Sequence, residues 1–135
     1  MRKIEVFFYG LFMDEQLLRA KGVTPTYLRP ASVSGFQLRI GTRATLVPTE
    51  IGRVFGLVAS LSHAELELLY SEPTVQSYRP EAVIANLSNG EPRAVLCVNL
   101  IEPPSPDEHN PEYASKLRSL AQQLQFPSEY VDSIV

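Results

Sequence analysis

The chain has 135 residues, of which 44% are hydrophobic and 20% charged, so we expect a single globular domain spanning residues 1–135. A formal net charge of −3 excludes the strongly basic balance typical of proteins that bind nucleic acid or anionic membranes. One cysteine excludes an intrachain disulfide, and no apolar run approaches the roughly 18 residues of a membrane span. We therefore expect a cytoplasmic protein with no signal peptide, nucleic-acid partner or membrane partner.

The chain begins with a strand pattern followed by a helix pattern. Residues 4–9 are rich in β-branched and aromatic side chains, and Gly10 ends the run, which predicts a first strand. Residues 13–20 contain good helix formers with a short apolar stripe, which predicts one or two helical turns.

Shorter patterns follow. Pro25 and Pro30 are predicted to enclose a loop, and weak alternation over residues 31–38 favours a strand. Residues 44–47 are short and apolar, and we expect Pro48 to end that segment.

Residues 54–59 are almost continuously apolar, which is typical of a strand buried on both faces. A helix is predicted to begin at Ser62, because Glu65 three residues later completes a capping box. Pro73 is expected to end this helix, since proline excludes the preceding residue from the helical region.

The C-terminal half predicts a hairpin, a loop and two helices. The hairpin consists of strands 79–86 and 93–100, joined by a turn at residues 88–90. The proline-rich residues 102–111 cannot join a sheet ladder and are expected to form an extended loop. An amphipathic helix is predicted from Asn110 and Pro111 onward, and a last short helix from Pro127 and Ser128.

About six strands and three or four helices indicate an α+β domain, and the pattern leaves a small, partly closed barrel and an open sheet both possible. The sequence lacks the spacings of a metal site and the glycine-rich nucleotide motifs, so we expect neither a metal nor another cofactor. His63 and His109 are interpreted as solvated surface residues, and Cys97 as a buried, unreactive thiol.

Two features could support chemistry. In the turn Tyr9–Met13 a buried strand stops at Gly10, and backbone N–H groups in such a turn can bind an anion. The alternative is an ordinary strand-to-helix turn in which Gly10 supplies a permissive backbone conformation.

The second feature is Glu72. A helical wheel of residues 61–72 places Glu72 in the apolar stripe formed by Leu61, Ala64, Leu68 and Leu69. A carboxylate directed at the core has a raised pKa, as a general base working near neutral pH requires. Alternatively, the helix ends early and Glu72 turns into solvent.

Several segments, in this order, resemble the gamma-glutamyl cyclotransferase-like superfamily. Residues 9–13 resemble its YGSL or YGTL loop, and residues 43–48 its PALVP-like stretch. Residues 53–58 resemble its VxGxVY strand. Residues 64–72 with the following Tyr78 and Arg79 are similar to its helix with a catalytic glutamate, and residues 124–131 to its LGLPxxYi ending.

The resemblance implies a small mixed β-barrel with flanking helices. It implies an enzyme that converts a γ-glutamyl amine or peptide to 5-oxoproline and the free amine, with Glu72 as general acid and base. It places the small-molecule substrate on the loop containing Tyr9, Gly10, Leu11 and Phe12, and it leaves the oligomeric state open. Arg43 could bind a substrate carboxylate and Tyr78 could line the pocket; an ion pair and simple packing are the respective alternatives.

Three residues depart from the family pattern. Leu11 replaces a small hydroxyl residue, Leu69 an aspartate and Pro73 a glycine. They leave open a second hypothesis, a module that binds a small carboxylate or γ-glutamyl ligand without turnover. A third is a protein adaptor that uses the loop between Pro103 and Pro111 and has an occluded pocket.

Overall fold

A closed barrel forms the centre of the computed structural model, which describes residues 2–71 and 77–135. Within these residues the strand order around the barrel is β1-β3-β2-β4-β5. Strand β1 pairs in parallel with β5, and the other pairings are antiparallel, so the predicted mixed barrel is confirmed. The strands are β1 (Lys3–Phe8), β2 (Thr26–Ile40), β3 (Ala44–Ser62), β4 (Tyr78–Leu87) and β5 (Pro92–Leu100).

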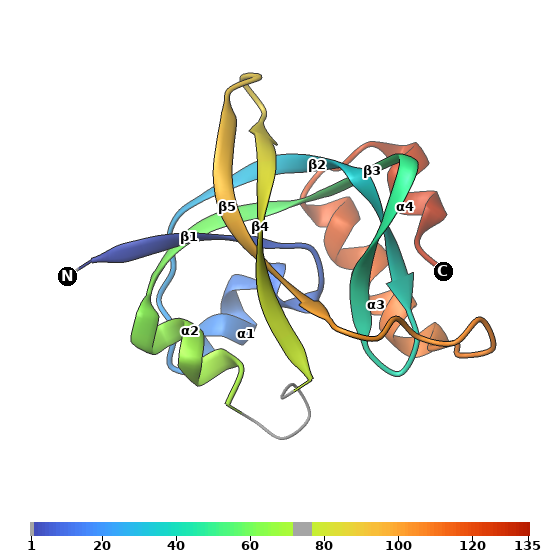
Figure 1. The fold of residues 1–135 in the computed structure, drawn as a ribbon, viewed down its shortest axis with the longest axis horizontal. Coiled ribbons are helices and arrows are strands. Elements are labelled where there is room, and N and C mark those ends of the chain that lie inside the picture. Colours follow the sequence, from blue (N-terminus) through green and yellow to red (C-terminus); the bar gives the residue numbers. More distant parts are fainter. Residues whose placement is uncertain (1, 72–76) are drawn as a thin grey trace.

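Short helices flank the barrel at two places (Figure 1). Helices α1 and α2 lie together near one end, and α3 and α4 pack on each other elsewhere on the barrel. No helix in the described parts of the chain is long and apolar enough to cross a membrane. The helical segments are the 3₁₀ turn η1 (Leu11–Met13), α1 (Glu15–Ala20), α2 (His63–Leu69), α3 (Pro111–Gln123) and α4 (Ser128–Ser133).

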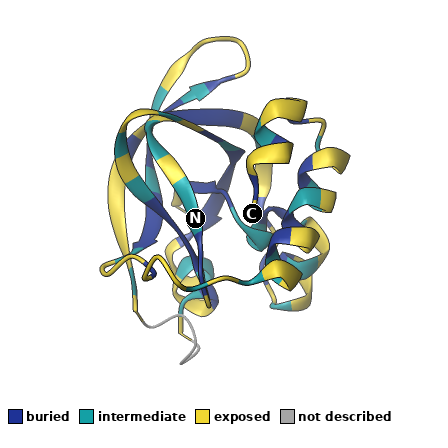
Figure 2. Ribbon diagram, turned by 90° about the vertical axis from the view of Figure 1, so that its right-hand side faces the viewer, coloured by how far each residue is buried: buried dark blue, intermediate teal, exposed yellow. Residues whose placement is uncertain are grey.

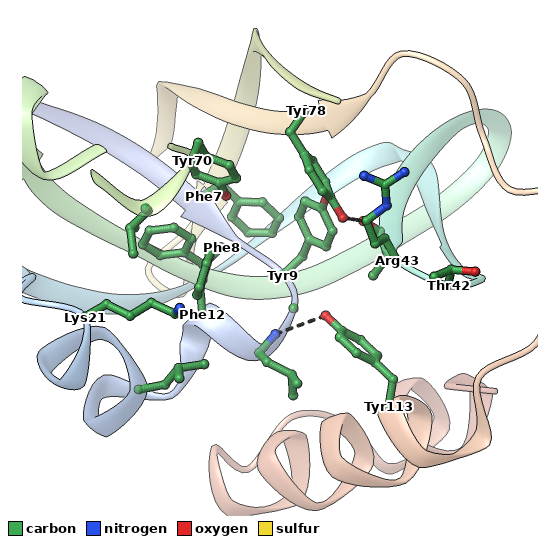
Figure 3. Close-up of a pocket in the computed structure, with 15 residues that line it drawn as sticks. Phe7, Phe8, Tyr9, Phe12, Lys21, Thr42, Arg43, Tyr70, Tyr78 and Tyr113 are labelled. Carbon is green, nitrogen blue, oxygen red and sulfur yellow. Dashed lines mark hydrogen bonds between the residues drawn. The ribbon is translucent and has the colours of Figure 1, made fainter. Parts of the chain in front are cut away.

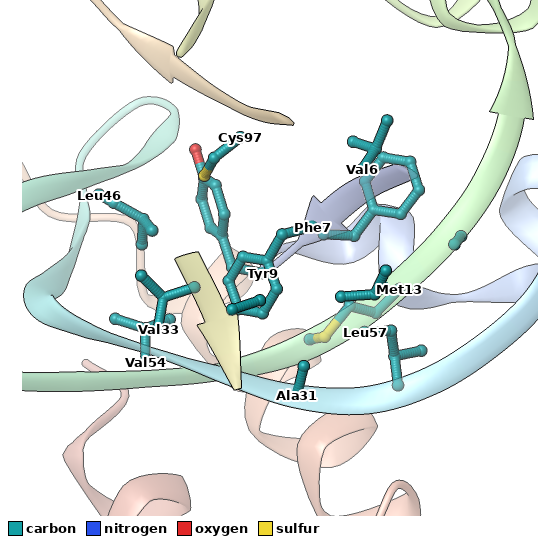
Figure 4. Close-up of a cluster of buried hydrophobic side chains, with 14 of the residues drawn as sticks. Val6, Phe7, Tyr9, Met13, Ala31, Val33, Leu46, Val54, Leu57 and Cys97 are labelled. Carbon is teal, nitrogen blue, oxygen red and sulfur yellow. The ribbon is translucent and has the colours of Figure 1, made fainter. Parts of the chain in front are cut away.

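Strand β1 is buried where it approaches its end. Three consecutive residues, Val6, Phe7 and Phe8, are at most 3% exposed, because neighbouring strands and helices cover both faces of the strand. Side chains from these and the other strands fill the barrel interior (Figure 4), and the outer faces of the helices remain exposed (Figure 2). The end of β1 is therefore held firmly, together with the loop that follows it.

Glycine allows β1 and β3 to approach closely. A Cβ atom placed on Gly56 would lie 2.2 Å from the Phe8 carbonyl oxygen and 2.7 Å from the Phe7 ring. Any larger residue would push the two strands apart, which explains a glycine within an apolar strand.

An ion-pair cluster joins three strands at the other end of β1. The Glu5 carboxylate accepts hydrogen bonds from Arg29 on β2 and from Arg93 on β5, the latter at 2.9 Å. Burial alone would raise the pKa of Glu5, but the two guanidinium groups outweigh it and lower that pKa.

Two strand predictions are wrong because a proline lies inside the strand and does not end it. Pro48 lies inside β3, which joins the two predicted segments 44–47 and 54–59 into one strand. Pro48 pairs with Phe36 on β2. Proline has no backbone N–H to donate, and a strand that is hydrogen-bonded to a neighbour on one side only can accommodate it. Pro30 lies inside β2 beyond a register shift, where Tyr27 has a positive φ of 53°.

Local signals at helix and turn boundaries predicted the structure well. Both hydrogen bonds of the Ser62–Glu65 capping box form, the Asn110 side chain caps α3, and Gly90 has the positive φ of 88° expected in the hairpin turn.

The predicted end of α2 was wrong. The helix stops at Leu69, Leu61 belongs to β3, and Leu68 is 48% exposed, so the helical wheel that singled out Glu72 does not apply.

The proline-rich segment is an extended loop, as predicted, and it is fastened to the turn between β2 and β3. The Glu108 carboxylate accepts hydrogen bonds from the backbone N–H groups of Ser105 at 2.8 Å and Thr42 at 3.2 Å, and from the Thr42 hydroxyl at 3.1 Å. Pro104 is buried, and a Cβ on Gly41 would lie 2.6 Å from its side chain. This loop therefore fixes the turn that carries Arg43.

We predict that Glu108→Ala loosens this turn. Amide hydrogen exchange measured by NMR should speed up at Thr42 and Ser105, and the exposed Glu112→Ala should leave both rates unchanged. The backbone hydrogen bonds lower the pKa of Glu108, so protection should persist down to the ordinary carboxyl pKa of about 4.3 and be lost only as the pH falls further. Unchanged exchange in Glu108→Ala would contradict this role.

Candidate functional site

A cavity of about 280 Å³ opens where β1 ends. Its walls come from the loop after β1, the turn between β2 and β3, the residues that flank α2 and β4, and helix α3 (Figure 3). The lining residues are mostly aromatic or aliphatic: Phe7, Phe8, Tyr9, Gly10, Leu11, Phe12, Leu17, Lys21, Thr42, Arg43, Ala44, Leu69, Tyr70, Tyr78 and Tyr113.

The residues predicted to bind substrate all line this cavity. They come from three separate parts of the sequence and are Tyr9, Gly10, Leu11, Phe12, Arg43 and Tyr78. The predicted catalytic residue, Glu72, lies outside the described residues. The binding roles of the six lining residues stay predictions, whereas the fold itself brings these residues to one cavity.

The loop after β1 meets a tyrosine from the C-terminal helix. The backbone N–H of Leu11 donates a hydrogen bond to the Tyr113 hydroxyl at 3.2 Å (Figure 3). The sequence predicts that the Leu11 N–H faces a ligand directly. To use this part of the loop, a ligand must therefore displace Tyr113 or accept a hydrogen bond from the Tyr113 hydroxyl. The phenolic oxygen accepts this bond, and its own proton has no acceptor among the residues that the structure describes.

Gly10 matters through the space that it leaves and not through its backbone conformation. Its φ of −113° is open to any residue, so the permissive-backbone interpretation of this glycine was wrong. A Cβ atom at this position would lie 2.5 Å from the Tyr113 hydroxyl oxygen. Glycine therefore lets α3 bring its phenol against the loop.

Two further phenols of the site, those of Tyr9 and Tyr78, are bonded to the barrel. The Tyr9 hydroxyl donates to the Val98 carbonyl at 2.8 Å, and the Tyr78 hydroxyl donates to the Ala44 carbonyl. Burial raises the pKa of both tyrosines, and for Tyr78 the nearby Arg43 opposes part of that rise. These residues offer a ligand their rings, whereas Tyr113 offers a hydroxyl proton.

A row of aromatic rings forms one wall. Phe12 meets Tyr70 edge to face with centroids 5.7 Å apart, and Tyr70 meets Tyr78 at 5.9 Å. Phe8 extends the row behind Phe12 at 6.0 Å. Such contacts fix the rings in place, so the wall has a defined shape before any ligand binds.

The charged residues lining the described part of the cavity are both basic. Lys21 and Arg43 are half-buried, and no carboxylate accompanies them among the described lining residues. The described walls therefore carry two basic side chains, each of which also has an interaction within the protein.

Other reactive side chains lie elsewhere. Cys97 is fully buried in β5 near Tyr9 (Figure 4), and burial raises the pKa of its thiol to about 12, which keeps it protonated and inert as predicted. His63 and His109 are exposed, also as predicted. Among the described residues no cluster of histidine, cysteine and acidic side chains could hold a metal.

Sequence reasoning missed four polar residues of the described cavity wall: Lys21, Thr42, Tyr70 and Tyr113. Tyr113 lies in the helix predicted from Asn110 and Pro111 onward. The available signal was the glycine at position 10, because a glycine can mark a close approach of another part of the chain.

We predict that Gly10→Ala destabilises the protein through its contact with Tyr113. The added methyl group would displace the phenol and should cost about 1–3 kcal/mol in the free energy of unfolding. Tyr113→Phe removes the oxygen, and the next ring atom lies 3.8 Å from the added Cβ, an ordinary contact. The double variant should therefore be more stable than the sum of the single changes predicts, as measured by denaturant unfolding. Additive effects would contradict the contact.

Comparisons with solved structures show which known fold the chain has. No family model and no curated protein matches the sequence. Among solved structures, a gamma-glutamyl cyclotransferase is 18% identical and aligns over 98% of this chain and 86% of its own, with a TM-score of 0.79. An Arabidopsis thaliana protein is 25% identical over 93% and 87% of the two chains, with a TM-score of 0.70. A mouse AIG2-like protein is 13% identical over 83% and 91%, with a TM-score of 0.60. The chain therefore has the gamma-glutamyl cyclotransferase-like fold.

Proposed function

We propose that the protein is a gamma-glutamyl cyclotransferase-like enzyme that releases 5-oxoproline from a γ-glutamyl amine or peptide. The observation that supports this most is the convergence of the six predicted binding residues on one cavity at the end of β1. Four of them follow β1 directly, Arg43 lies in the turn between β2 and β3, and Tyr78 begins β4.

The sequence around Glu72 supports its role as general acid and base. Leu69 and Tyr70 precede it closely, Tyr78 follows it, and all three line the cavity. In the proposed role, Glu72 needs a carboxyl pKa raised toward neutral pH, as a general base does.

The reaction needs little beyond positioning and proton transfer. The α-amine nitrogen of the glutamyl group attacks its own γ-carbonyl carbon, forming the C–N bond of a five-membered lactam. The original C–N bond to the departing amine then breaks. Glu72 accepts a proton from the attacking nitrogen and returns it to the leaving nitrogen, so the carboxylate is regenerated. Because attack is intramolecular, a wall that holds the substrate folded supplies much of the rate.

Tyr113 provides a donor for the oxygen that gains charge in this reaction. Its hydroxyl is held by the Leu11 N–H, so its proton is directed by a fixed backbone group. A donor held in place in an apolar pocket stabilises developing negative charge more than a mobile one.

The alternative is a module that binds a small carboxylate or γ-glutamyl ligand without turnover. Leu11 in the loop favours it, because the hydroxyl contact of related loops is lost. The adaptor hypothesis predicts an exposed proline-rich loop and an occluded pocket. Pro103, Pro106 and Pro111 are exposed and Pro104 is buried, but the cavity is present, which does not favour that hypothesis.

We predict that Glu72→Gln abolishes 5-oxoproline release. Loss of the proton acceptor should lower kcat by about 100-fold or more, as general-base removal commonly does. The assay is a panel of γ-glutamyl amines and dipeptides, with 5-oxoproline quantified by mass spectrometry.

Glu67→Gln is the matched control, because Glu67 is an exposed carboxylate of α2. It should retain full activity, and both variants should unfold at the wild-type temperature. Full activity in Glu72→Gln would refute the assignment. Saturable ligand binding by wild-type protein without any turnover would favour the non-catalytic alternative.

A further inference from the structure

We infer that Glu108 and Asn110 are positioning residues, which hold Thr42 so that the turn between β2 and β3 keeps a fixed spacing from helix α3 across the cavity. We call these two residues the Thr42 clasp. Neither is among the described residues that line the cavity, so the clasp acts on a ligand only through the residues that it holds. The inference rests on the proposed function and concerns how two walls of that site are set against each other.

The clasp binds all three polar groups of Thr42. The N–H and the hydroxyl of Thr42 donate to the Glu108 carboxylate at 3.2 and 3.1 Å. The Thr42 carbonyl oxygen accepts a hydrogen bond from the Asn110 side-chain amide at 3.4 Å. The next two residues of the chain, Arg43 and Ala44, line the cavity, so the clasp fixes this wall.

The Asn110 side chain uses its two ends for two different elements. Its oxygen accepts a hydrogen bond from the Tyr113 backbone N–H at 3.1 Å and so caps α3, while its nitrogen donates to the Thr42 carbonyl. Tyr113 then extends from α3 into the cavity, where its hydroxyl meets the Leu11 N–H (Figure 3). One amide group therefore joins the β2–β3 turn to the helix that presents the proposed donor.

The same turn also holds the aromatic wall. The Tyr78 hydroxyl donates to the Ala44 carbonyl, and the Tyr78 ring lies against Tyr70 with centroids 5.9 Å apart. A displaced turn would therefore move these rings relative to Tyr113. Intramolecular cyclisation is sensitive to such a movement, because its rate depends on how closely the reacting atoms are held.

The test removes the amide donor of Asn110 and keeps the helix cap. Asn110→Asp and Asn110→Ser both retain an oxygen for the Tyr113 N–H, and both residues cap helices about as well as asparagine. Neither offers an amide hydrogen to the Thr42 carbonyl. The melting temperature should stay within about 4 °C of wild type. On the best substrate of the γ-glutamyl panel, kcat should fall about tenfold and KM should change less than about twofold.

A double variant distinguishes positioning from general loosening of the fold. If Asn110 acts by placing the phenol, its replacement should matter little once the hydroxyl is gone. We therefore expect Asn110→Asp to lower kcat less than about twofold in the Tyr113→Phe background. Equal losses in the two backgrounds would overturn the inference, as would wild-type kcat in both single Asn110 variants.

Each position of the clasp has a matched control. Asn89→Asp makes the same change in the β4–β5 turn, where the Asn89 side-chain oxygen accepts from the Glu91 N–H at 2.9 Å, and it should keep wild-type kcat. Glu108→Ala should lower kcat as the Asn110 variants do, whereas the exposed Glu112→Ala should not. Wild-type kcat in Glu108→Ala would remove that residue from the clasp and overturn the inference.

Amide hydrogen exchange measured by NMR tests the coupling without turnover. Both Asn110 variants should speed exchange at Leu11, because the phenol that accepts its N–H moves, and Asn89→Asp should not. Absence of 5-oxoproline release by wild-type protein, together with faster exchange at Leu11 in the Asn110 variants, would contradict the proposed function and support the coupling. Wild-type exchange at Leu11 in both Asn110 variants would overturn the inference whether or not the protein is an enzyme.

Discussion

The hydrogen bond from the Leu11 N–H to the Tyr113 hydroxyl joins residues 102 positions apart and defines the site. On one side, β1 is held between β3 and β5, so its end and the loop after it have one position. On the other side, the Asn110 cap fixes the start of α3 and thereby the phenol. Gly10 leaves the space in which the two meet. The cavity forms because the loop after β1 and the start of α3 are each held in position by contacts of their own.

This arrangement changes how the loop can act on a ligand. A loop without Tyr113 would offer its backbone N–H groups directly to a ligand. Here the Leu11 N–H donates to the Tyr113 hydroxyl oxygen, and the hydroxyl proton of Tyr113 can in turn be donated to a ligand. The aromatic wall lowers the local dielectric, so polar contacts within it are strengthened. A few polar groups in an apolar cavity are enough to orient a small substrate for cyclisation.

Local patterns in the sequence predicted the parts of the fold that local physics decides. The Ser62–Glu65 capping box, the Asn110 cap and the turn at Gly90 each depend on neighbours a few residues away. Prediction failed where distant packing decides, as for Pro48 within β3. Of the cavity, the resemblance supplied the loop, Arg43 and Tyr78, whereas Lys21 and Tyr113 join it only through the tertiary fold.

The central claim is that the cavity at the end of β1, with Tyr113 as its donor, is the ligand site. The most direct test is a crystal structure of the Glu72→Gln variant with γ-glutamylalanine. The account predicts a ligand oxygen about 2.5–3.0 Å from the Tyr113 hydroxyl, with the ligand lying along the wall of Phe12, Tyr70 and Tyr78. A ligand bound in the neighbouring hollow beside Arg79 and Pro103, or one that makes no contact with Tyr113, would contradict it.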